Sequence, residues 1–153
     1  MLLMMGILLA GLLTVGVLSS PKEVVISYLK NLPLCLKTGM NIFVSELVDE
    51  KVARRLQIWL DAWRSSGYSS SARLLNLEFK EVKIENGSAV VVTAERWEYS
   101  YTYIDTGEVA LPPQRIFYEV SYRLRREGEG WKIQEIEILK EVKEDGCGSD
   151  CGR

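Results

Sequence analysis

The sequence predicts an α+β protein in which N-terminal helices pack on a strongly curved, antiparallel, four-stranded sheet, with an apolar helix ahead of them. Three observations predict this fold class. Residues 1–18 contain no charged side chain. Between residues 20 and 66 the apolar side chains recur three and four positions apart, which is helical spacing. After Gly67 they alternate with polar residues, and the alternation changes phase repeatedly, which indicates long strands bent by bulges.

Residues 1–19 are expected to be a transmembrane anchor or a signal segment. The apolar run of residues 1–18 just reaches the roughly 17–25 residues that a membrane-spanning helix needs. No basic residue precedes Lys22, and Val17-Leu18-Ser19-Ser20 followed by Pro21 is a poor cleavage signal. These features favour an uncleaved anchor; a cleaved and secreted protein is the alternative.

Two arguments about the orientation of this anchor point in opposite directions. Lys22, Lys30 and Lys37 lie on the C-terminal side of the apolar run, and by the positive-inside rule they favour a cytoplasmic domain. A short apolar stretch at the extreme N-terminus, however, generally acts as an export signal. We therefore expect a membrane-anchored protein whose domain is extracytoplasmic.

The length of the chain allows one domain, and its charge argues against nucleic acid as a partner. The chain has 153 residues, and residues 20–142 are enough for a single domain with its own core. Its 19 basic and 21 acidic residues are mixed along the chain and give a net charge of −2. Because no basic field exists, nucleic acid is not an expected partner. Residues 143–153, rich in Gly, Asp and Glu, are expected to form a flexible tail.

Two helices can be placed from their ends. Ser20 followed by Pro21 and Glu23 has the capping-box pattern, and the helix that begins there is expected to end at Pro33. Asp49 caps a second helix that runs to about Ser66. Its apolar stripe consists of Val52, Leu56, Trp59, Leu60 and Trp63. Residues 34–48 are ambiguous, and a short helix with a turn around Gly39 is expected there.

The first two strands form a predicted hairpin. The alternation changes phase between Phe79 and Val82, which predicts a bulge near Lys80-Glu81. Asn86-Gly87 is the strongest short hairpin signal. The return strand, residues 88–104, is also expected to change phase, with Val90 and Val92 on one face and the aromatic residues after Arg96 on the other.

The last two strands follow a turn at residues 105–107. Pro112-Pro113 is expected to break the chain before a strand over residues 116–125. A second turn at residues 127–130 leads to the last strand, from Trp131 to about Val142, with a phase shift between Ile133 and Ile136. The helices are then expected to fill the concave side of the curled sheet, giving an α+β cone.

Three motifs carry a resemblance to a known family. They are the helix of residues 52–59 (VARRLQIW), the strand of residues 117–124 (FYEVSYRL) and Gly130-Trp131-Lys132-Ile133. With the order of elements, they resemble the nuclear transport factor 2-like (NTF2-like), or cystatin-like, superfamily. Over residues 48–139 the chain looks most like the intermembrane-space domain of chloroplast and cyanobacterial division proteins. One-span envelope proteins such as the VirB8-like secretion components resemble it equally in layout.

The resemblance implies one candidate enzymatic chemistry. Enzymes of this fold place an Asp or Glu base with His or Tyr partners inside the cone. This chain contains no His. Catalytic candidates are therefore limited to Asp61, Glu95, Glu98, Tyr99 and Tyr101. The competing and preferred interpretation is that all three carboxylates face solvent and that no residue is catalytic; an enzyme would bury at least one of them.

Aromatic residues give a second candidate site, for a ligand or a protein partner. Tyr and Trp supply a large contact area with a polar group attached. The candidates are Trp59, Trp63, Trp97, Tyr99, Tyr101 and Tyr103. The simpler interpretation is that these aromatic residues, on the second helix and on the return strand, belong to the core.

The cysteines do not indicate a metal site. Cys147 and Cys151 lie between glycines near the C-terminus and are candidates for a small disulfide. Cys35 is the third and last thiol, one short of a tetrahedral structural site. We expect no metal and no cofactor.

These observations together predict a membrane-tethered, non-enzymatic domain that acts in protein interaction or envelope assembly. It can also hold an apolar ligand in its cone. The alternative is a small lyase or isomerase with a carboxylate–tyrosine site. The expected partners are the membrane, through residues 1–18, another protein, and a second copy of the chain through the sheet face.

Overall fold

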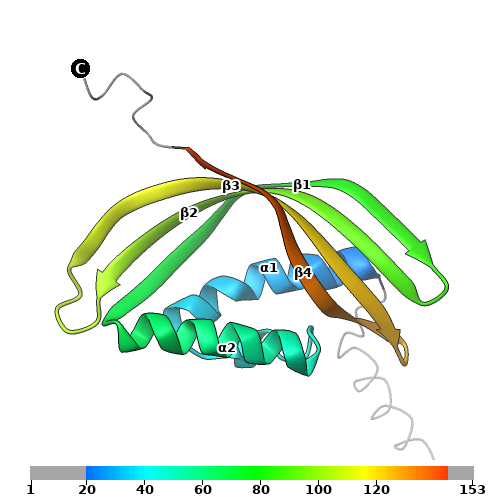
Figure 1. Cartoon of the computed structure of the whole chain (residues 1–153), viewed down its shortest axis with the longest axis horizontal. Coiled ribbons are helices and arrows are strands. Elements are labelled where there is room, and N and C mark those ends of the chain that lie inside the picture. The colour runs from blue at the N-terminus through cyan, green and yellow to red at the C-terminus, as the bar shows by residue number, and fades with distance from the viewer. Residues whose placement is uncertain (1–19, 145–153) are drawn as a thin grey trace, which may run out of the picture.

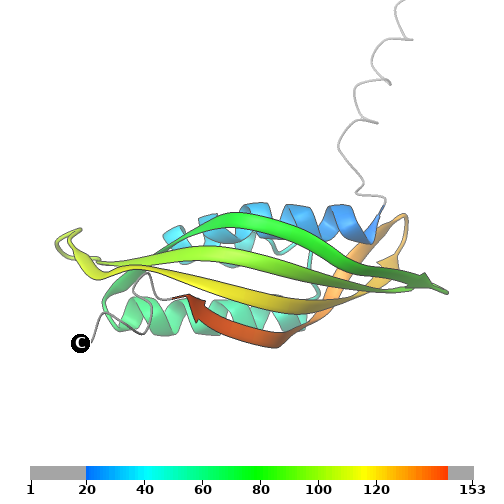
Figure 2. The ribbon, with the colours of Figure 1, turned by 90° about the horizontal axis from the view of Figure 1, so that it is seen from above.

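A computed structural model describes residues 20–144, which form two α-helices, one short 3₁₀ helix and four strands. The elements are α1 (Pro21–Thr38), the 3₁₀ helix η1 (Asn41–Phe43), α2 (Glu50–Ser65), β1 (Tyr68–Glu85), β2 (Ser88–Tyr103), β3 (Val109–Glu127) and β4 (Gly130–Glu144). The strands form one antiparallel sheet in the order β1-β2-β3-β4. Figure 1 shows the sheet arching over both helices, and Figure 2 shows it from above as a long, twisted surface. The predicted α+β class is confirmed.

Two predicted segments fall outside this description. The anchor, residues 1–19, and the tail from residue 145 onward are not described. Over residues 20–144, none of the helices combines the length and apolar character of a membrane span. β4 continues to Glu144, two residues past the boundary expected at residue 142.

Helix α1 begins where the sequence predicts and ends later. The Ser20 hydroxyl accepts a hydrogen bond from the Glu23 N–H at 3.1 Å, as the capping pattern requires. The prediction that the helix ends at Pro33 is wrong, because α1 continues to Thr38. Proline removes one helical hydrogen bond, but Cys35 and Leu36 beyond it are buried, and this packing offsets the loss. The helix ends at Gly39, with φ of 75°.

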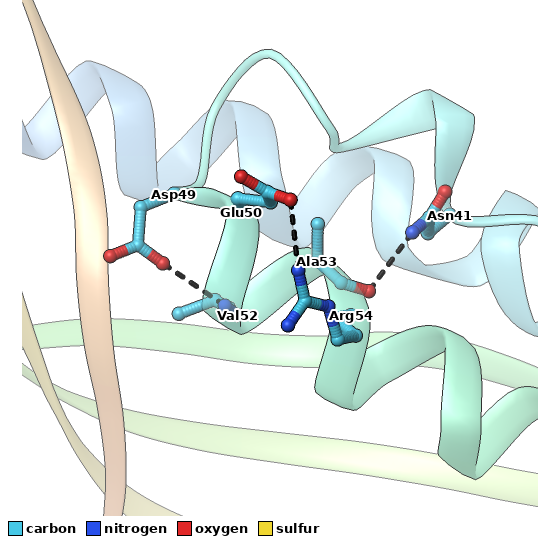
Figure 3. Close-up of polar contacts among 6 residues, drawn as sticks. All are labelled: Asn41, Asp49, Glu50, Val52, Ala53 and Arg54. Atoms are coloured by element: carbon cyan, nitrogen blue, oxygen red, sulfur yellow. Dashed lines mark hydrogen bonds and ion pairs between the residues drawn. The ribbon is translucent and has the colours of Figure 1, made fainter.

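Helix α2 is anchored at its N-terminus by three polar contacts, drawn in Figure 3. The Asp49 side chain accepts a hydrogen bond from the Val52 N–H at 3.0 Å. Arg54 pairs with Glu50 at 2.8 Å, and the Asn41 amide donates to the Ala53 carbonyl at 2.9 Å. Farther along, α2 packs loosely, and of its residues only Leu60 is fully buried.

The β1–β2 hairpin is close to its prediction. Asn86 and Gly87 have φ of 45° and 79°, which is the backbone of a two-residue primed turn. The pairing slips between Phe79 and Glu81, where the bulge is predicted. A second slip between Leu74 and Asn76 adds curvature that the sequence did not indicate.

The predicted change of phase within β2 is wrong. Ala89, Val91, Thr93, Glu95 and Trp97 all lie on one face of the strand and are all buried. Pairing with β3 is continuous from Ser88 to Tyr99. Val90 and Val92 lie on the opposite face and are half-buried. The bend of the hairpin therefore comes from the bulges of β1. On the opposite face of β2 the small residue Ala94 is also buried, at 6% exposed.

The predicted break at Pro112-Pro113 is also wrong, because β3 runs through both prolines. Tyr99 pairs with Gln114 and Tyr101 with Leu111, so the prolines occupy a bulge. β4 pairs with β3 only from Arg115 onward, which leaves the prolines on an edge. Proline is tolerated at both kinds of position. The phase shift predicted in β4 is confirmed between Ile133 and Glu135.

The core lies between α1 and the concave face of the sheet. The segment before α2 closes one end of it: the Ile133 N–H donates to the Leu47 carbonyl, and the Asp49 N–H donates to the Ile133 carbonyl, both at 2.9 Å. The largest fully buried side chains of the core include Trp97, Tyr122, Leu29, Leu124, Ile133, Val24 and Val25.

Candidate functional site

A buried carboxylate lies at the centre of the concave face. Glu95 is 3% exposed. Its Oε2 accepts hydrogen bonds from Thr93 Oγ1 and from the Tyr122 hydroxyl, both at 2.6 Å, and its Oε1 accepts one from Trp97 Nε1 at 2.8 Å. Three donors on two oxygens match an ionised carboxylate, which only accepts.

The strand geometry explains how these groups meet. Thr93, Glu95 and Trp97 are two residues apart on β2, so their side chains point to the same face of the sheet. Tyr122 comes from the neighbouring strand β3, where it pairs with Val91. Because the sheet is curved, side chains on its concave face converge. The Tyr122 hydroxyl therefore reaches the carboxylate of Glu95.

The negative charge of Glu95 has no cationic side chain against it. Within residues 20–144 no Lys or Arg forms an ion pair with this carboxylate. A buried charge without an opposite charge costs several kcal/mol, and hydrogen bonds recover only part of that cost.

The tyrosines around Glu95 have perturbed acidity. The pKa of Tyr122 is raised well above its usual value by burial, then by the charge of Glu95 and by the hydrogen bond to it. Burial also raises the pKa of Tyr28, with smaller contributions from Cys35 and Glu95. For Tyr99 the causes of the raised pKa are burial, then Tyr118 and Glu95.

A cavity of about 170 Å³ lies against Glu95. Five aromatic rings line it together with the carboxylate: Tyr28, Trp97, Tyr99, Tyr118 and Tyr122. Trp97 stacks on Tyr99 at 5.9 Å between ring centroids, and Tyr99 meets Tyr118 edge to face at 6.5 Å. The remaining lining is aliphatic, from Leu29, Leu32, Val120, Ile136 and Ile138.

A larger groove of about 570 Å³ adjoins this cavity, between α2 and β4. The two hollows share Tyr28, Ile136 and Ile138 in their walls. Val52, Leu56 and Trp59 of α2 form the apolar wall opposite β4, and Lys51, Arg55, Gln134 and Glu135 add polar groups. The groove exists because α2 packs loosely on the sheet.

The predicted carboxylates separate into three different settings. Asp61 is exposed and accepts a hydrogen bond from Gln57 at 2.8 Å. Glu98 lies on the opposite face of β2 from Glu95 and pairs with Arg73 and Arg115 at 3.1 and 3.2 Å. The expectation that all three face solvent is wrong for Glu95, because the curved sheet carries its side chain into the core.

The predicted aromatic residues divide between two clusters. Trp97 and Tyr99 line the cavity beside Glu95. Trp63 stacks on Tyr101 at 4.7 Å and packs edge to face against Trp59 and Tyr68 at 5.8 and 6.0 Å; Tyr103 packs on Tyr68. The expectation that Trp59 is a core residue is wrong, because it is 43% exposed.

The sequence did not identify Tyr122, Thr93, Tyr28 or Tyr118 as site residues. Tyr118 and Tyr122 lie on the apolar parity of β3, which is a sign of burial but not of contact with a carboxylate. Cys147 and Cys151 lie outside the described residues, and Cys35 is a buried free thiol. Across residues 20–144 no group of three metal-ligating side chains is arranged to hold a metal ion.

Comparisons with known proteins identify the fold. No protein-family model and no curated protein sequence matches the chain. Among solved structures, the intermembrane space region of chloroplast protein ARC6 superposes with a TM-score of 0.68 at 17% identity, covering 77% of this chain and 92% of that one. A hexachlorocyclohexane dehydrochlorinase, LinA Type2, gives a TM-score of 0.47 at 8% identity, over 82% of this chain and 90% of that one. The match to ARC6 shows that the chain has the predicted NTF2-like fold, in the form seen in the intermembrane space region of that protein.

Proposed function

We propose that this domain is a protein-interaction module that takes an apolar segment of a partner into the groove between α2 and β4. The observation that carries the proposal is the groove itself, about 570 Å³ and walled by Val52, Leu56, Trp59, Ile136 and Ile138. Trp59 and Ile138 are 43% and 56% exposed. Partly exposed Trp and aliphatic residues around a groove are typical of binding surfaces.

Charge narrows the chemistry of the partner. Lys51 and Arg55 lie along the α2 side of the groove, and within residues 20–144 neither forms an ion pair. Glu135 on the β4 side already pairs with Arg123. A segment that combines apolar side chains with at least one carboxylate therefore complements the groove.

Membrane tethering is part of the same proposal. The length and lack of charge of residues 1–18 support an anchor. The similar fold in an intermembrane space region supports an extracytoplasmic domain. A role in envelope assembly is part of the proposal. The homodimer expected through the sheet face stays a proposal, and ion pairs such as Lys80–Glu119 and Arg96–Glu144 on the strands mean that such a contact would be polar.

Peptide selection against the immobilised full chain tests the groove. We expect a random peptide library to yield apolar peptides that contain Asp or Glu and that compete with one another. Ile138→Lys should weaken their binding by about tenfold or more, and Arg55→Glu should abolish the preference for acidic peptides.

Ile84→Lys is the matched control. Ile84 is 57% exposed, nearly the same as Ile138, but it lies at the β1–β2 hairpin and does not line the groove. Its substitution should leave binding unchanged. Equal losses in both variants, or selection of peptides without shared character, would contradict the proposal.

A second candidate function, acid–base catalysis, follows from the burial of Glu95. Its carboxylate lies 2.6 Å from the Tyr122 hydroxyl and borders a cavity, the arrangement of a carboxylate–tyrosine site. Such a lyase or isomerase would exchange the acidic protons of bound carbonyl compounds. Deuterium incorporation into a panel of small ketones, followed by NMR, should then be lost in Glu95→Gln and kept in Glu98→Gln. No incorporation with any member of the panel would remove this candidate.

A further inference from the structure

The cavity at Glu95 combines two features that a structural role does not require together. It holds a buried carboxylate with no cation against it, and it is walled by five aromatic rings. Apolar packing alone would be served by aliphatic residues, and a buried Glu adds desolvation cost to it. The combination is complementary to a positively charged ligand, because aromatic faces and a carboxylate both attract a cation.

The hydrogen bonds of Glu95 narrow the class of cation. Its oxygens already accept from Thr93, Trp97 and Tyr122. A primary ammonium would have to compete for these lone pairs, since its N–H groups need acceptors. A methylated ammonium has no such need, and it interacts with a carboxylate by charge and with aromatic rings by their faces.

We propose that this cavity binds a small organic cation carrying a trimethylammonium group, with Glu95 as its counter-ion and the surrounding rings as its walls. The volume of about 170 Å³ suits a small ligand of this kind. Lys51 and Arg55 line the neighbouring groove but not this cavity, so no cationic side chain of the described residues occupies the place of the ligand.

The raised pKa of Tyr122 agrees with this electrostatic setting. After burial, the charge of Glu95 is the largest cause of the shift, so the carboxylate acts strongly on groups that face the cavity. A cation bound in the cavity would be attracted by the same negative charge. The site differs from the peptide groove and does not depend on it, although Tyr28, Ile136 and Ile138 border both.

The test compares choline with its uncharged carbon isostere, in which a tert-butyl group replaces the trimethylammonium group. Both are titrated calorimetrically into the full chain, kept in a non-ionic detergent because phosphocholine detergents would compete. We expect choline and tetramethylammonium to bind about tenfold or more tightly than the isostere. Equal binding of choline and the isostere, or no heat from choline, would overturn the proposal.

Substitutions locate the site. Glu95→Gln, which keeps the shape of the side chain, should reduce the affinity for choline by about tenfold. Glu98→Gln, on the same strand but the opposite face, should not change it. If Glu95→Gln does not fold, Tyr118→Leu tests a wall of the cavity, with Tyr118→Phe as the control that keeps the ring. Loss with Leu and retention with Phe supports the site, and equal affinity in both contradicts it.

One more ligand distinguishes a lipid headgroup from a small free cation as the natural ligand. Glycerophosphocholine is the soluble headgroup of a choline lipid. Binding of both compounds at similar strength indicates a site open to a lipid headgroup, whereas binding of choline alone indicates a small free cation. Trp59→Ala separates this proposal from the peptide groove, because Trp59 lines the groove but not the cavity. It should weaken peptide binding and leave choline binding unchanged.

Discussion

At the scale of single residues, the molecule is organised around a negative charge in its core. Glu95 is held by three donors, two of them on the same strand and one on the next. Hydrogen bonds to a charged group each contribute about 1.5–3 kcal/mol, roughly twice as much as neutral ones. The stability of the core therefore depends on keeping these donors in place.

Tyr122→Phe removes one donor and leaves the ring. We expect it to lower the free energy of unfolding by about 1–3 kcal/mol, because a buried carboxylate loses a partner and gains none. Urea unfolding followed by circular dichroism measures the loss. Tyr103→Phe is the control, since Tyr103 is 43% exposed. A difference between the two variants below about 0.5 kcal/mol would contradict the importance of this hydrogen bond.

The sequence held more information about Glu95 than its pattern of apolar residues indicated. Glu95 shares its parity with Trp97 and Tyr99, so a single-phase strand places it beside them. Val90 and Val92 suggested a change of phase, because valine on the outer face of a sheet cannot be distinguished from valine in a core by alternation alone. The contact with Tyr122 depends on curvature, which no local pattern specifies.

At the scale of elements, the beginnings of both helices and the hairpin turn were predictable, and interruptions inside elements were not. Ser20, Asp49 and Asn86-Gly87 act through contacts between neighbours in the chain, which the sequence displays directly. Pro33 and Pro112-Pro113 were expected to interrupt elements that continue through them. Packing and an available bulge decide such cases, and both are tertiary properties.

Gly39 joins α1 to the rest of the chain and has two reasons to be glycine. Its φ of +75° is unfavourable for other residues, and a Cβ there would lie 2.2 Å from Arg64 Cδ of α2. We expect Gly39→Ala to lower the free energy of unfolding by about 1–2 kcal/mol from the backbone and by more from the displaced Arg64 side chain. Thermal and urea unfolding measure the change.

Gly107→Ala separates the two causes. Gly107 has a similar φ of +71°, but a Cβ there would meet nothing within 4 Å. The excess loss in Gly39→Ala over Gly107→Ala therefore reports the contact between the helices. Equal losses would show that Arg64 moves aside without cost.

At the scale of the whole molecule, one sheet arches over both helices (Figure 1). Its concave face contributes to the core, to the cavity and to one wall of the groove. α1 contributes the most buried helical residues, whereas α2 covers the remaining space loosely. The fold class could be predicted from element order, because two helices followed by a bulged meander have few ways to bury their apolar faces. The groove could not, because it depends on how closely α2 approaches the sheet.

The tyrosines make the stability of the whole domain sensitive to high pH. Burial raises the pKa of Tyr28, Tyr99, Tyr101, Tyr118 and Tyr122. Above about pH 10 these groups lose their protons in the unfolded chain but keep them in the folded one. The contribution of these protonated tyrosines to the free energy of unfolding is therefore fully present below about pH 10. As the pH rises above that value it is lost, by up to about 1.4 kcal/mol per pH unit for each group.

Urea unfolding between about pH 8 and 11 measures this dependence. The free energy of unfolding should fall steeply above about pH 10, and Tyr122→Phe should reduce the slope. Tyrosinate absorbance from these residues should rise only as the domain unfolds. A rise for all seven tyrosines while the circular dichroism stays native would contradict the prediction.

Three of the four groups in the Glu95 hydrogen-bond network come from five consecutive residues, Thr93 to Trp97, and the fourth follows 27 positions after Glu95. Because these residues lie so close together in the chain, the network can be recognised from the amino-acid sequence. A strand that reads Thr-x-Glu-x-Trp, followed at that interval by a Tyr on the apolar parity of the next strand, is a signature that can be searched for in other chains. Proteins too divergent to align with this one could thus be recognised as carrying the same buried anion.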